Sequence, residues 1–351
     1  MKKLIILTLI VLAISACGQQ EIKTTPTTSS PETLTIMTHD SFAVSEAVIQ
    51  AFENQNHVKV QILTSGDAGT ALNKAILAKR NPLADVFYGV DNTFLSRALD
   101  ENIFETYNAP ILASIPDQFK LDPQNWAVPI DYGDVCLNYD EAYFTERNLP
   151  PPQNLSDLEK PEYRSLLVVE NPASSSPGLA FLLATIGRFG EEQYLDYWQK
   201  LVDNDVLVVN SWEQAYYTEF SHYGGTRPIV VSYGSSPPFE VIFAETPIDE
   251  PSTAVITADQ SCFRQVEFAG ILKGTKNRDL AEKWIDFMLS TTFQEDIPLQ
   301  MYVFPVNPAA KLDERFSKFM SVPTETAFVS PEDIAAKRET WIKSWTETVL
   351  R

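Results

Sequence analysis

The chain has 351 residues, of which 44% are hydrophobic and 21% charged, a balance typical of a folded globular protein. Its formal net charge is −20 at pH 7, because 47 Asp and Glu residues outnumber 27 Lys and Arg residues. A chain this acidic excludes a nucleic-acid partner, which needs basic phosphate contacts, and weakly favours a cationic ligand. The part after the N-terminal segment, about 320 residues, is long enough for two lobes with separate hydrophobic cores.

The N-terminus is typical of a secretory signal. Lys2 and Lys3 precede the apolar run Leu4–Ile14, and small residues come directly before Cys17. The apolar run is too short for a comfortable membrane span. The sequence ISAC that ends at Cys17 is similar to a bacterial lipobox. We therefore predict a lipoprotein signal peptide at residues 1–16 and lipidation of Cys17; the alternative is an ordinary signal peptide with an unrelated cysteine.

The segment that follows the predicted cleavage site is rich in Thr, Ser and Pro. Residues 17–33 contain one large apolar residue, Ile22, and cannot bury enough surface to fold. They predict a flexible tether that leads from the lipid to the folded body. We therefore expect an exported protein, periplasmic or at the cell surface, that is anchored to a membrane through Cys17.

The first part of the body alternates predicted strands with predicted helices. Residues 34–56 form such a unit, and the pattern repeats over residues 57–80 and 82–107. This order predicts a parallel sheet with helical crossovers. Ligands of such sheets bind at loops beyond the carboxyl ends of the strands, which here are residues 38–41, 65–69 and 89–92.

Two long extended runs with little helical signal interrupt this alternation. Residues 126–140 and 261–277 are predicted to cross from one lobe to the other and back. The fold class is therefore α/β, with two lobes joined by two extended crossings and a ligand cleft between them. We assign residues 34–128 and 266–351 to a discontinuous first lobe, and residues 129–265 to the second.

Cysteines and helix caps add smaller expectations. Cys136 and Cys262 lie in the two predicted crossings, where they form either a disulfide or two separate buried thiols. Ser211 with Gln214 fits a capping box, and Ser330 followed by proline predicts the start of the last helix.

Signals of catalysis are scarce. The three histidines show no HExxH spacing, and the chain has neither a G-x-S-x-G sequence nor a P-loop. The sequence therefore predicts a protein that is not an enzyme and has no catalytic residue, metal site or cofactor. Aromatic residues at loops are more informative: Trp212, Tyr233, Phe239 and Tyr302 suit a flat ligand ring, although each alone is also consistent with a core position.

A run of serines precedes another predicted helix. Ser174, Ser175 and Ser176 stand directly before Pro177, which fits the first turn of a helix. Ser176 is then the expected N-cap. Ser174 and Ser175 remain as candidates for binding the polar or phosphate end of a ligand, beside the free amides of the helix N-terminus.

Together these segments resemble the periplasmic thiamine-binding proteins that serve ABC importers. The matching segments run in order along nearly the whole body, at residues 34–43, 84–99, 128–140, 167–186, 210–220, 229–243, 265–289 and 297–308. The resemblance implies a two-lobe, type II-like periplasmic-binding-protein fold. It also implies a monomeric solute-binding protein that closes on thiamine or a thiamine phosphate and delivers it to the importer's permease and ATPase.

The resemblance also implies particular binding residues. The phosphate end would be held by the serine loop and Trp212, with Tyr233 nearby, and a second binding loop would contain Ser65, Gly66 and Asp67. Aromatic side chains at the positions of His39, Phe239 and Tyr302 would sandwich the ligand rings. Family members usually carry Tyr, Tyr and Trp at these three positions. All three residues here still offer a π face, so the resemblance leaves the vitamin form open.

A cationic thiazolium ring calls for an acidic partner. The candidates at loops are Asp40, Asp67, Asp91 and Asp131, each of which is also consistent with a helix cap or a solvated turn. Three alternatives stay open. The same importer role could serve a polyamine or another heteroaromatic cation; ferric iron could use the tyrosine pair at residues 216–217; or the protein could be an exported thiamine-processing enzyme with a cysteine nucleophile.

Overall fold

A computed structural model describes residues 32–350 of the chain. The predicted signal peptide, the lipidation site at Cys17 and nearly all of the tether at 17–33 lie outside the described residues. From residue 32 onward the chain clusters as one unit. Across residues 32–350, no helix is both long enough and apolar enough to cross a membrane.

The main strands join in one mixed sheet. Their order is β2 (Val58–Thr64), β1 (Glu32–Thr38), β3 (Val86–Asp91), β10 (Phe263–Leu272), β5 (Val128–Asp140), β8 (Ile229–Tyr233), β6 (Leu167–Glu170) and β7 (Leu207–Val209). At one end β1 pairs in parallel with β2 and β3, and at the other β6 pairs in parallel with β7 and β8. Between them, β10 and β5 are antiparallel to each other and to their outer neighbours.

The helices follow the strands in the predicted alternation. They are α1 (Glu46–Asn56), α2 (Ala68–Leu77), α3 (Leu95–Asp100), α4 (Glu141–Glu146), α5 (Ser176–Phe189), α6 (Tyr194–Asp203), α7 (Trp212–Gln214), α8 (Pro237–Ile242), α9 (Arg278–Met288), α10 (Thr291–Gln294), α11 (Pro298–Met301), α12 (Glu314–Phe319) and α13 (Pro331–Val349). Short strands complete the sheet: β4 (Phe104–Glu105) pairs with β10, while β9 (Thr253–Ile256) and β11 (Phe304–Pro305) pair with β5. The predicted α/β class is confirmed.

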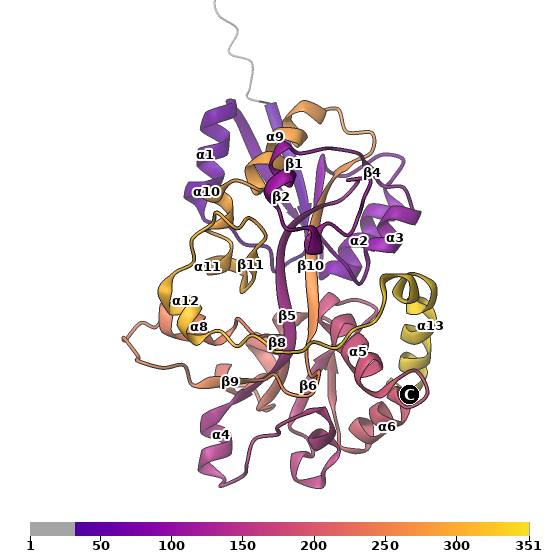
Figure 1. Cartoon of the computed structure of the whole chain (residues 1–351), viewed down its shortest axis with the longest axis vertical. Coiled ribbons are helices and arrows are strands. Elements are labelled where there is room, and N and C mark those ends of the chain that lie inside the picture. Colours follow the sequence, from indigo (N-terminus) through magenta and orange to yellow (C-terminus); the bar gives the residue numbers. More distant parts are fainter. Residues whose placement is uncertain (1–31, 351) are drawn as a thin grey trace, which may run out of the picture. The chain divides into compact units, whose positions relative to one another are not determined.

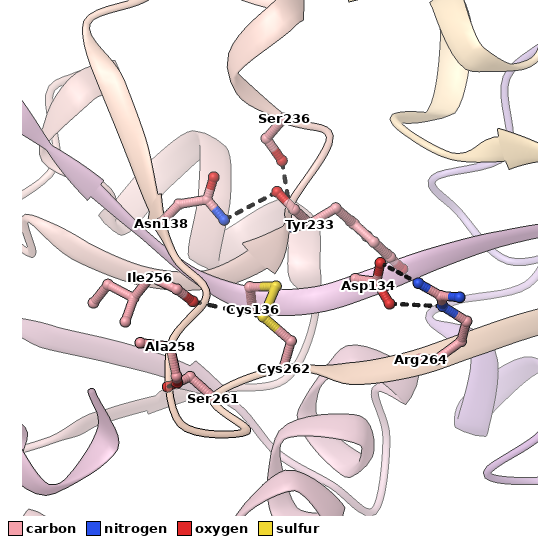
Figure 2. The surroundings of a disulfide bond; sticks show 10 residues. All are labelled: Asp134, Cys136, Asn138, Tyr233, Ser236, Ile256, Ala258, Ser261, Cys262 and Arg264. Carbon is pink, nitrogen blue, oxygen red and sulfur yellow. Dashed lines mark hydrogen bonds and ion pairs between the residues drawn. A yellow bond between two sulfur atoms is a disulfide. The ribbon is translucent and has the colours of Figure 1, made fainter. Parts of the chain in front are cut away.

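The two predicted crossings are the long central strands β5 and β10. They run side by side between one group of elements around β1–β3 and a second group around β6–β8 (Figure 1). A disulfide joins Cys136 of β5 to Cys262, which directly precedes β10, with the two Cα atoms 4.4 Å apart (Figure 2). Of the two alternatives left by the sequence, the structure has the disulfide, which ties the crossings together.

Local sequence signals explain several helix boundaries. The Ser211 side chain accepts a hydrogen bond from the Gln214 amide at 3.3 Å, and Ser330 accepts one from Asp333 at 3.0 Å. Ser211 and Ser330 are therefore confirmed as the N-caps of α7 and α13. The predicted N-cap of α5 is wrong by one residue: Ser176 already belongs to the helix, and Ser175 is the N-cap. Proline tolerates either of the first two helical positions, so Pro177 alone did not determine the boundary.

The C-terminal elements contact both groups of strands and helices. Trp345 of α13 packs edge-on against Trp198 of α6, at a ring-centroid distance of 5.4 Å. The same helix places Arg338 against α3, where its guanidinium donates a hydrogen bond to Ser96 at 3.0 Å. The division into lobes at 34–128 with 266–351, and at 129–265, stays a prediction; α13 bridges it.

Candidate functional site

A cavity of about 190 Å³ opens where loops from both groups of elements meet. The loop after β1, the starts of α2, α5 and α7, strand β10 and the segment after α11 all contribute to its wall. Its lining residues are His39, Asp40, Ser41, Phe42, Ala43, Asp67, Ala68, Ser176, Pro177, Trp212, Glu213, Tyr217, Tyr233, Glu267, Gln300, Met301, Tyr302 and Val303. Loops at the carboxyl ends of strands therefore form much of the cavity, as expected for this fold class.

The structure brings six of the predicted site residues together at this cavity. They are His39, Asp40, Asp67, Trp212, Tyr233 and Tyr302. The other five do not line it: Ser65, Gly66, Ser174, Ser175 and Phe239. Their contacts show what each of these five does instead.

Ser65 and Gly66 support the lining residues from behind. The Gly66 carbonyl accepts a hydrogen bond from the Asp40 amide at 3.1 Å. Gly66 has φ +93°, a left-handed conformation that a side chain would strain. The Ser65 hydroxyl donates to the Leu63 carbonyl at 3.2 Å, so it is used within its own loop. This loop sets the direction from which Asp67 enters the cavity.

The three serines at the start of α5 have different roles from those predicted from the sequence. The Ser174 hydroxyl donates to the Asn210 carbonyl at 2.8 Å, and Ser174 does not line the cavity. Ser175 is fully buried; its hydroxyl lies beside the Asp67 carboxyl but makes no hydrogen bond of good geometry. Ser176, the expected cap, does line the cavity and accepts a hydrogen bond from Gln265 at 2.7 Å.

Aromatic rings form one side of the cavity. Phe239 stacks face to face on Tyr302 with ring centroids 3.6 Å apart, so Tyr302 covers it from the cavity. Trp212 approaches Tyr302 at 5.6 Å, and the Tyr217 and Tyr302 hydroxyls are hydrogen-bonded at 3.0 Å. Burial raises the pKa of both tyrosines, so their hydroxyls stay neutral. This aromatic wall, made of Trp212, Tyr217 and Tyr302, offers neutral π faces and hydroxyls.

Acidic side chains form another part of the cavity wall, next to the aromatic rings. Asp67 accepts hydrogen bonds from the Ala68 amide at 2.6 Å and from the Trp212 amide at 3.0 Å. It therefore contacts the first turns of both α2 and α7, where the helix dipoles stabilise an anion. Burial raises the pKa of Asp67, and these two amides oppose the rise. Burial also raises the pKa of Glu213 at the rim, and nearby Asp40 adds to the rise.

Glu267 and His39 are paired at the acidic side. Nε2 of His39 lies 3.4 Å from Oε1 of Glu267, and both side chains are buried in the cavity wall. Burial lowers the pKa of His39, but the Glu267 carboxylate outweighs it, and the pKa of the imidazole is raised above its usual value. For Glu267, burial raises the pKa, and the charge of His39 outweighs it in the opposite direction. Both pKa shifts favour an imidazolium facing a carboxylate.

Further carboxyl groups lie behind this pair. The Tyr88 hydroxyl lies 2.7 Å from Asp131 and 2.9 Å from Glu267. Burial and the charge of Glu267 raise the pKa of Asp131 well above its usual range, which favours its protonated form. Burial raises the pKa of Asp91 to about 7, against the hydrogen bonds from Thr93. These groups are not lining residues, and they leave Glu267 as the ionised member of the network.

Sequence reasoning missed several lining residues, among them the carboxyl groups of Glu267 and Glu213, and it considered Tyr217 only as one of a pair of iron ligands. Glu267 lies in the middle of an extended crossing and not in a loop, so loop position did not single it out. Strand alternation was a usable signal: Gln265 and Glu267 are two residues apart and point to the same face of β10. In the described part of the chain, no group of three or more His, Cys, Asp or Glu side chains is arranged to hold a metal ion.

The comparisons with known proteins agree with this architecture. Residues 81–326 match the family of bacterial extracellular solute-binding proteins, and the chain belongs to that family. The family is described as one of extracellular binding proteins, which supports a role in solute binding. The two-lobe binding-protein fold predicted from the sequence is confirmed by the structural matches.

The most informative comparisons are with thiamine-binding proteins. It is 30% identical to the thiamine-binding periplasmic protein of Salmonella typhimurium LT2 over 323 residues, which cover 91% of this chain and 94% of that protein. A solved periplasmic thiamin binding protein superposes with a TM-score of 0.81 at 28% identity, covering 92% of this chain and 100% of that one. The predicted resemblance is confirmed. A ferric binding protein from Campylobacter jejuni shares the fold, with a TM-score of 0.71 at 19% identity over 90% of this chain and 99% of that chain.

Proposed function

We propose that the protein captures thiamine, or a thiamine phosphate, in this cavity and delivers it to an ABC importer. The observation that carries the proposal is the pairing of an acidic side with an aromatic wall around one cavity. Thiamine presents a cationic thiazolium and a flat pyrimidine, and this combination matches both sides. The thiamine-binding relatives support the same ligand.

The charge of the lining favours a cation. Four lining residues carry carboxyl groups, Asp40, Asp67, Glu213 and Glu267, and His39 is the single basic side chain among the lining residues. In a partly dehydrated cavity such an arrangement attracts a positive ring much more strongly than in water. The same carboxyl groups repel a phosphate dianion. We therefore expect free thiamine to bind more tightly than its phosphate esters.

The aromatic wall supplies the second contribution. A cationic ring that stacks on a well-placed aromatic face gains roughly 0.5–2 kcal/mol. Tyr302 is the best placed, because Phe239 supports its far face and its backbone carbonyl accepts a hydrogen bond from the Ser235 hydroxyl. Tyr302 is thus held in one orientation before the ligand arrives, which reduces the entropy lost on binding.

Closure of the two lobes would complete the site. The Trp212 amide donates to Asp67, and the Gly69 amide donates to the Ser174 carbonyl at 3.0 Å. Both bonds join elements assigned to different lobes, so they exist only when the lobes are together. A ligand that contacts Asp67 and Trp212 at once shifts the population toward this closed state.

The remaining parts of the proposal concern location and partners. The N-terminal pattern supports export, cleavage before Cys17 and lipid attachment there. The protein would act as a monomer tethered to a membrane, and its partners would be the permease and ATPase of the importer. Mass spectrometry of the mature N-terminus, before and after Cys17→Ser, tests the lipid; an unmodified Cys17 in membrane fractions would contradict it.

Titration calorimetry with thiamine and thiamine monophosphate tests the ligand. We expect saturable binding of thiamine at micromolar concentration or below, quenching of tryptophan fluorescence through Trp212, and weaker binding of the phosphate. Spermidine, ferric citrate and prolonged incubation with thiamine test the alternatives. Saturable spermidine binding, a visible ferric–tyrosinate band or cleavage of the vitamin would each replace the thiamine-importer proposal, and absence of thiamine binding would remove it.

A further inference from the structure

The His39–Glu267 pair is an unusual element of a site for a cation. Nε2 of the imidazole and Oε1 of the carboxylate are 3.4 Å apart, and both groups line the cavity where a ligand would enter. An imidazolium at this point is itself a small aromatic cation. It pairs with the Glu267 carboxylate, which a cationic ligand would need as its own counter-ion.

The His39 ring is held in place by its neighbours. Gly89 lies against it, and a Cβ at Gly89 would be 2.3 Å from Cδ2 of the imidazole, so only glycine leaves room for the ring. Tyr88 contacts the ring at a centroid distance of 5.5 Å. Nε2 makes no hydrogen bond of good geometry, although it is buried. The ring is therefore positioned beside Glu267 by packing, with its polar atom free to respond to a ligand.

Every charged or titratable group that faces His39 is acidic or neutral. Glu267 on β10 is the nearest, Asp67 at the start of α2 and Asp40 in the same loop add negative potential, and Glu213 of α7 interacts from the rim. Tyr88 on β3 is neutral, because burial raises the pKa of its hydroxyl well above the usual value. The environment thus retains a proton on His39 as long as no other cation is present.

We infer, on the basis of the proposed thiamine role, that Glu267 is the counter-ion of the ligand's cationic ring and that His39 gives up its proton when that ring enters. One N–H bond of the imidazolium breaks, the proton passes to the solvent, and the ring stays neutral. The charge near Glu267 is then the same before and after binding, with the thiazolium in place of the imidazolium. The exchange avoids two cations that share one carboxylate in a dry cavity.

The proposed proton exchange predicts the direction in which the affinity for thiamine changes with pH. Below the pKa of His39 in the free protein, cation binding must expel a proton, so affinity falls as pH falls, at most about tenfold per pH unit. Above that pKa the ring is already neutral, and affinity no longer changes with pH through this group. For a neutral ligand at the same site, affinity would either rise as pH falls or not change with pH.

Calorimetry in buffers of different ionisation enthalpy measures the exchange directly. For the intact protein and thiamine we expect release of up to one proton. The release should be largest between the pKa of His39 in the bound protein and its higher pKa in the free protein, and it should decline to zero above the free-protein pKa. His39→Phe should abolish the release and flatten the pH dependence while thiamine still binds. His222→Gln is the matched control, because His222 also faces a carboxylate, Glu240 at 3.9 Å, but does not line the cavity; it should release protons like the unaltered protein.

Glu267→Gln tests the counter-ion. It should weaken thiamine binding about tenfold to a hundredfold, because a buried charge partner is lost. The chain has only three histidines, so the His39 imidazole signal can be followed by NMR without ligand. In the ligand-free protein Glu267→Gln should lower the pKa of His39, and thiamine should lower it in the intact protein.

The outcomes separate this inference from the proposed function. If thiamine does not bind, the proposed function is wrong, and the inference, which rests on it, falls as well. If thiamine binds with the same affinity from pH 5.5 to 8.5 and releases no proton, the thiamine role stands and the proton exchange is overturned. If Glu267→Gln folds, judged by its thermal midpoint, and binds thiamine as tightly as the unaltered protein, Glu267 is not the counter-ion.

Discussion

The acidic and the aromatic parts of the cavity wall differ in chemistry and come mostly from different parts of the fold, although Glu213 and Trp212 are neighbours on α7. The acidic side consists of Asp67 and Glu267 with His39, held by the first turn of α2, strand β10 and the loop after β1. The aromatic wall of Trp212, Tyr217 and Tyr302 comes from α7, the π-helical turn after it and the segment after α11.

The two parts of the wall select different properties of a ligand. The acidic side selects for positive charge whatever the shape of the ligand, and its affinity for a cation depends on pH. The aromatic wall responds to flatness and is nearly independent of pH, because burial raises the pKa of its tyrosines. A ligand must satisfy both sides, so each can be weakened separately, and the four predictions below are ordered by the effect we expect.

Asp67→Asn should have the largest effect of these four variants. The amide retains an acceptor for the Ala68 amide but removes the charge beside the cavity and weakens the contact with the Trp212 amide. We expect thiamine affinity to fall roughly a hundredfold, because hydrogen bonds to a charged group contribute about 1.5–3 kcal/mol. Asp117→Asn is the control, since Asp117 is 98% exposed and pairs with Lys120. Equal affinities of the two variants, measured by calorimetry, would contradict a charge-selective side.

Tyr302→Leu should remove the main stacking surface of the aromatic wall. We expect about a tenfold loss of thiamine affinity, equal at pH 6 and pH 8, from the loss of one cation–π contact. Phe328→Leu is the control, because Phe328 is an exposed aromatic residue outside the cavity. A loss that depends on pH would show that the two sides are not separate.

Tyr217→Phe should have a smaller effect. It removes the hydrogen bond between the Tyr217 and Tyr302 hydroxyls but retains both rings. A neutral hydrogen bond contributes about 0.5–1.5 kcal/mol, so we expect a few-fold weaker binding, seen as a faster release of thiamine in stopped-flow fluorescence. An effect as large as that of Tyr302→Leu would mean that the hydroxyls, and not the π faces, select the ligand.

Ser175→Ala should have the smallest effect. The buried Ser175 hydroxyl lies beside Asp67 at the N-terminus of α5. The serine loop is the predicted phosphate position, but Ser175 itself is buried and does not line the cavity, so the variant should weaken binding of thiamine monophosphate at most about two- to threefold and leave free thiamine unchanged. Calorimetry with both ligands measures the ratio. An equal effect on both would contradict a phosphate position at this loop.

Several features of the fold follow from local sequence. The alternation of strand and helix, the caps at Ser211 and Ser330, and the two extended crossings all depend on residues close together in the chain. His39, Asp67 and Trp212 lie in loops or at helix starts that follow predicted strands, and the resemblance to thiamine-binding proteins singled them out there as binding residues. Loop position is a local property, and a fold of this class brings such loops to one edge of its sheet.

Other features could not be predicted from local sequence. Phe239 looked like a free aromatic surface, but Tyr302, 63 positions later, covers it at 3.6 Å. Glu267 looked like part of a strand, and whether it faces the cavity or the opposite surface depends on the register of β10 with β3 and β5. A shift of one residue would reverse the face.

The sequence by itself determined the α/β class, the two crossings, the family and the kinds of side chain at the strand ends. These depend on periodicity, capping and motif order, which act over a few residues. Tertiary structure decided which candidates meet, which serine lines the cavity, that Cys136 and Cys262 are joined, and that His39 faces Glu267. Each of these is a contact between distant segments, and the packing of the whole sheet and its helices sets the distance between them.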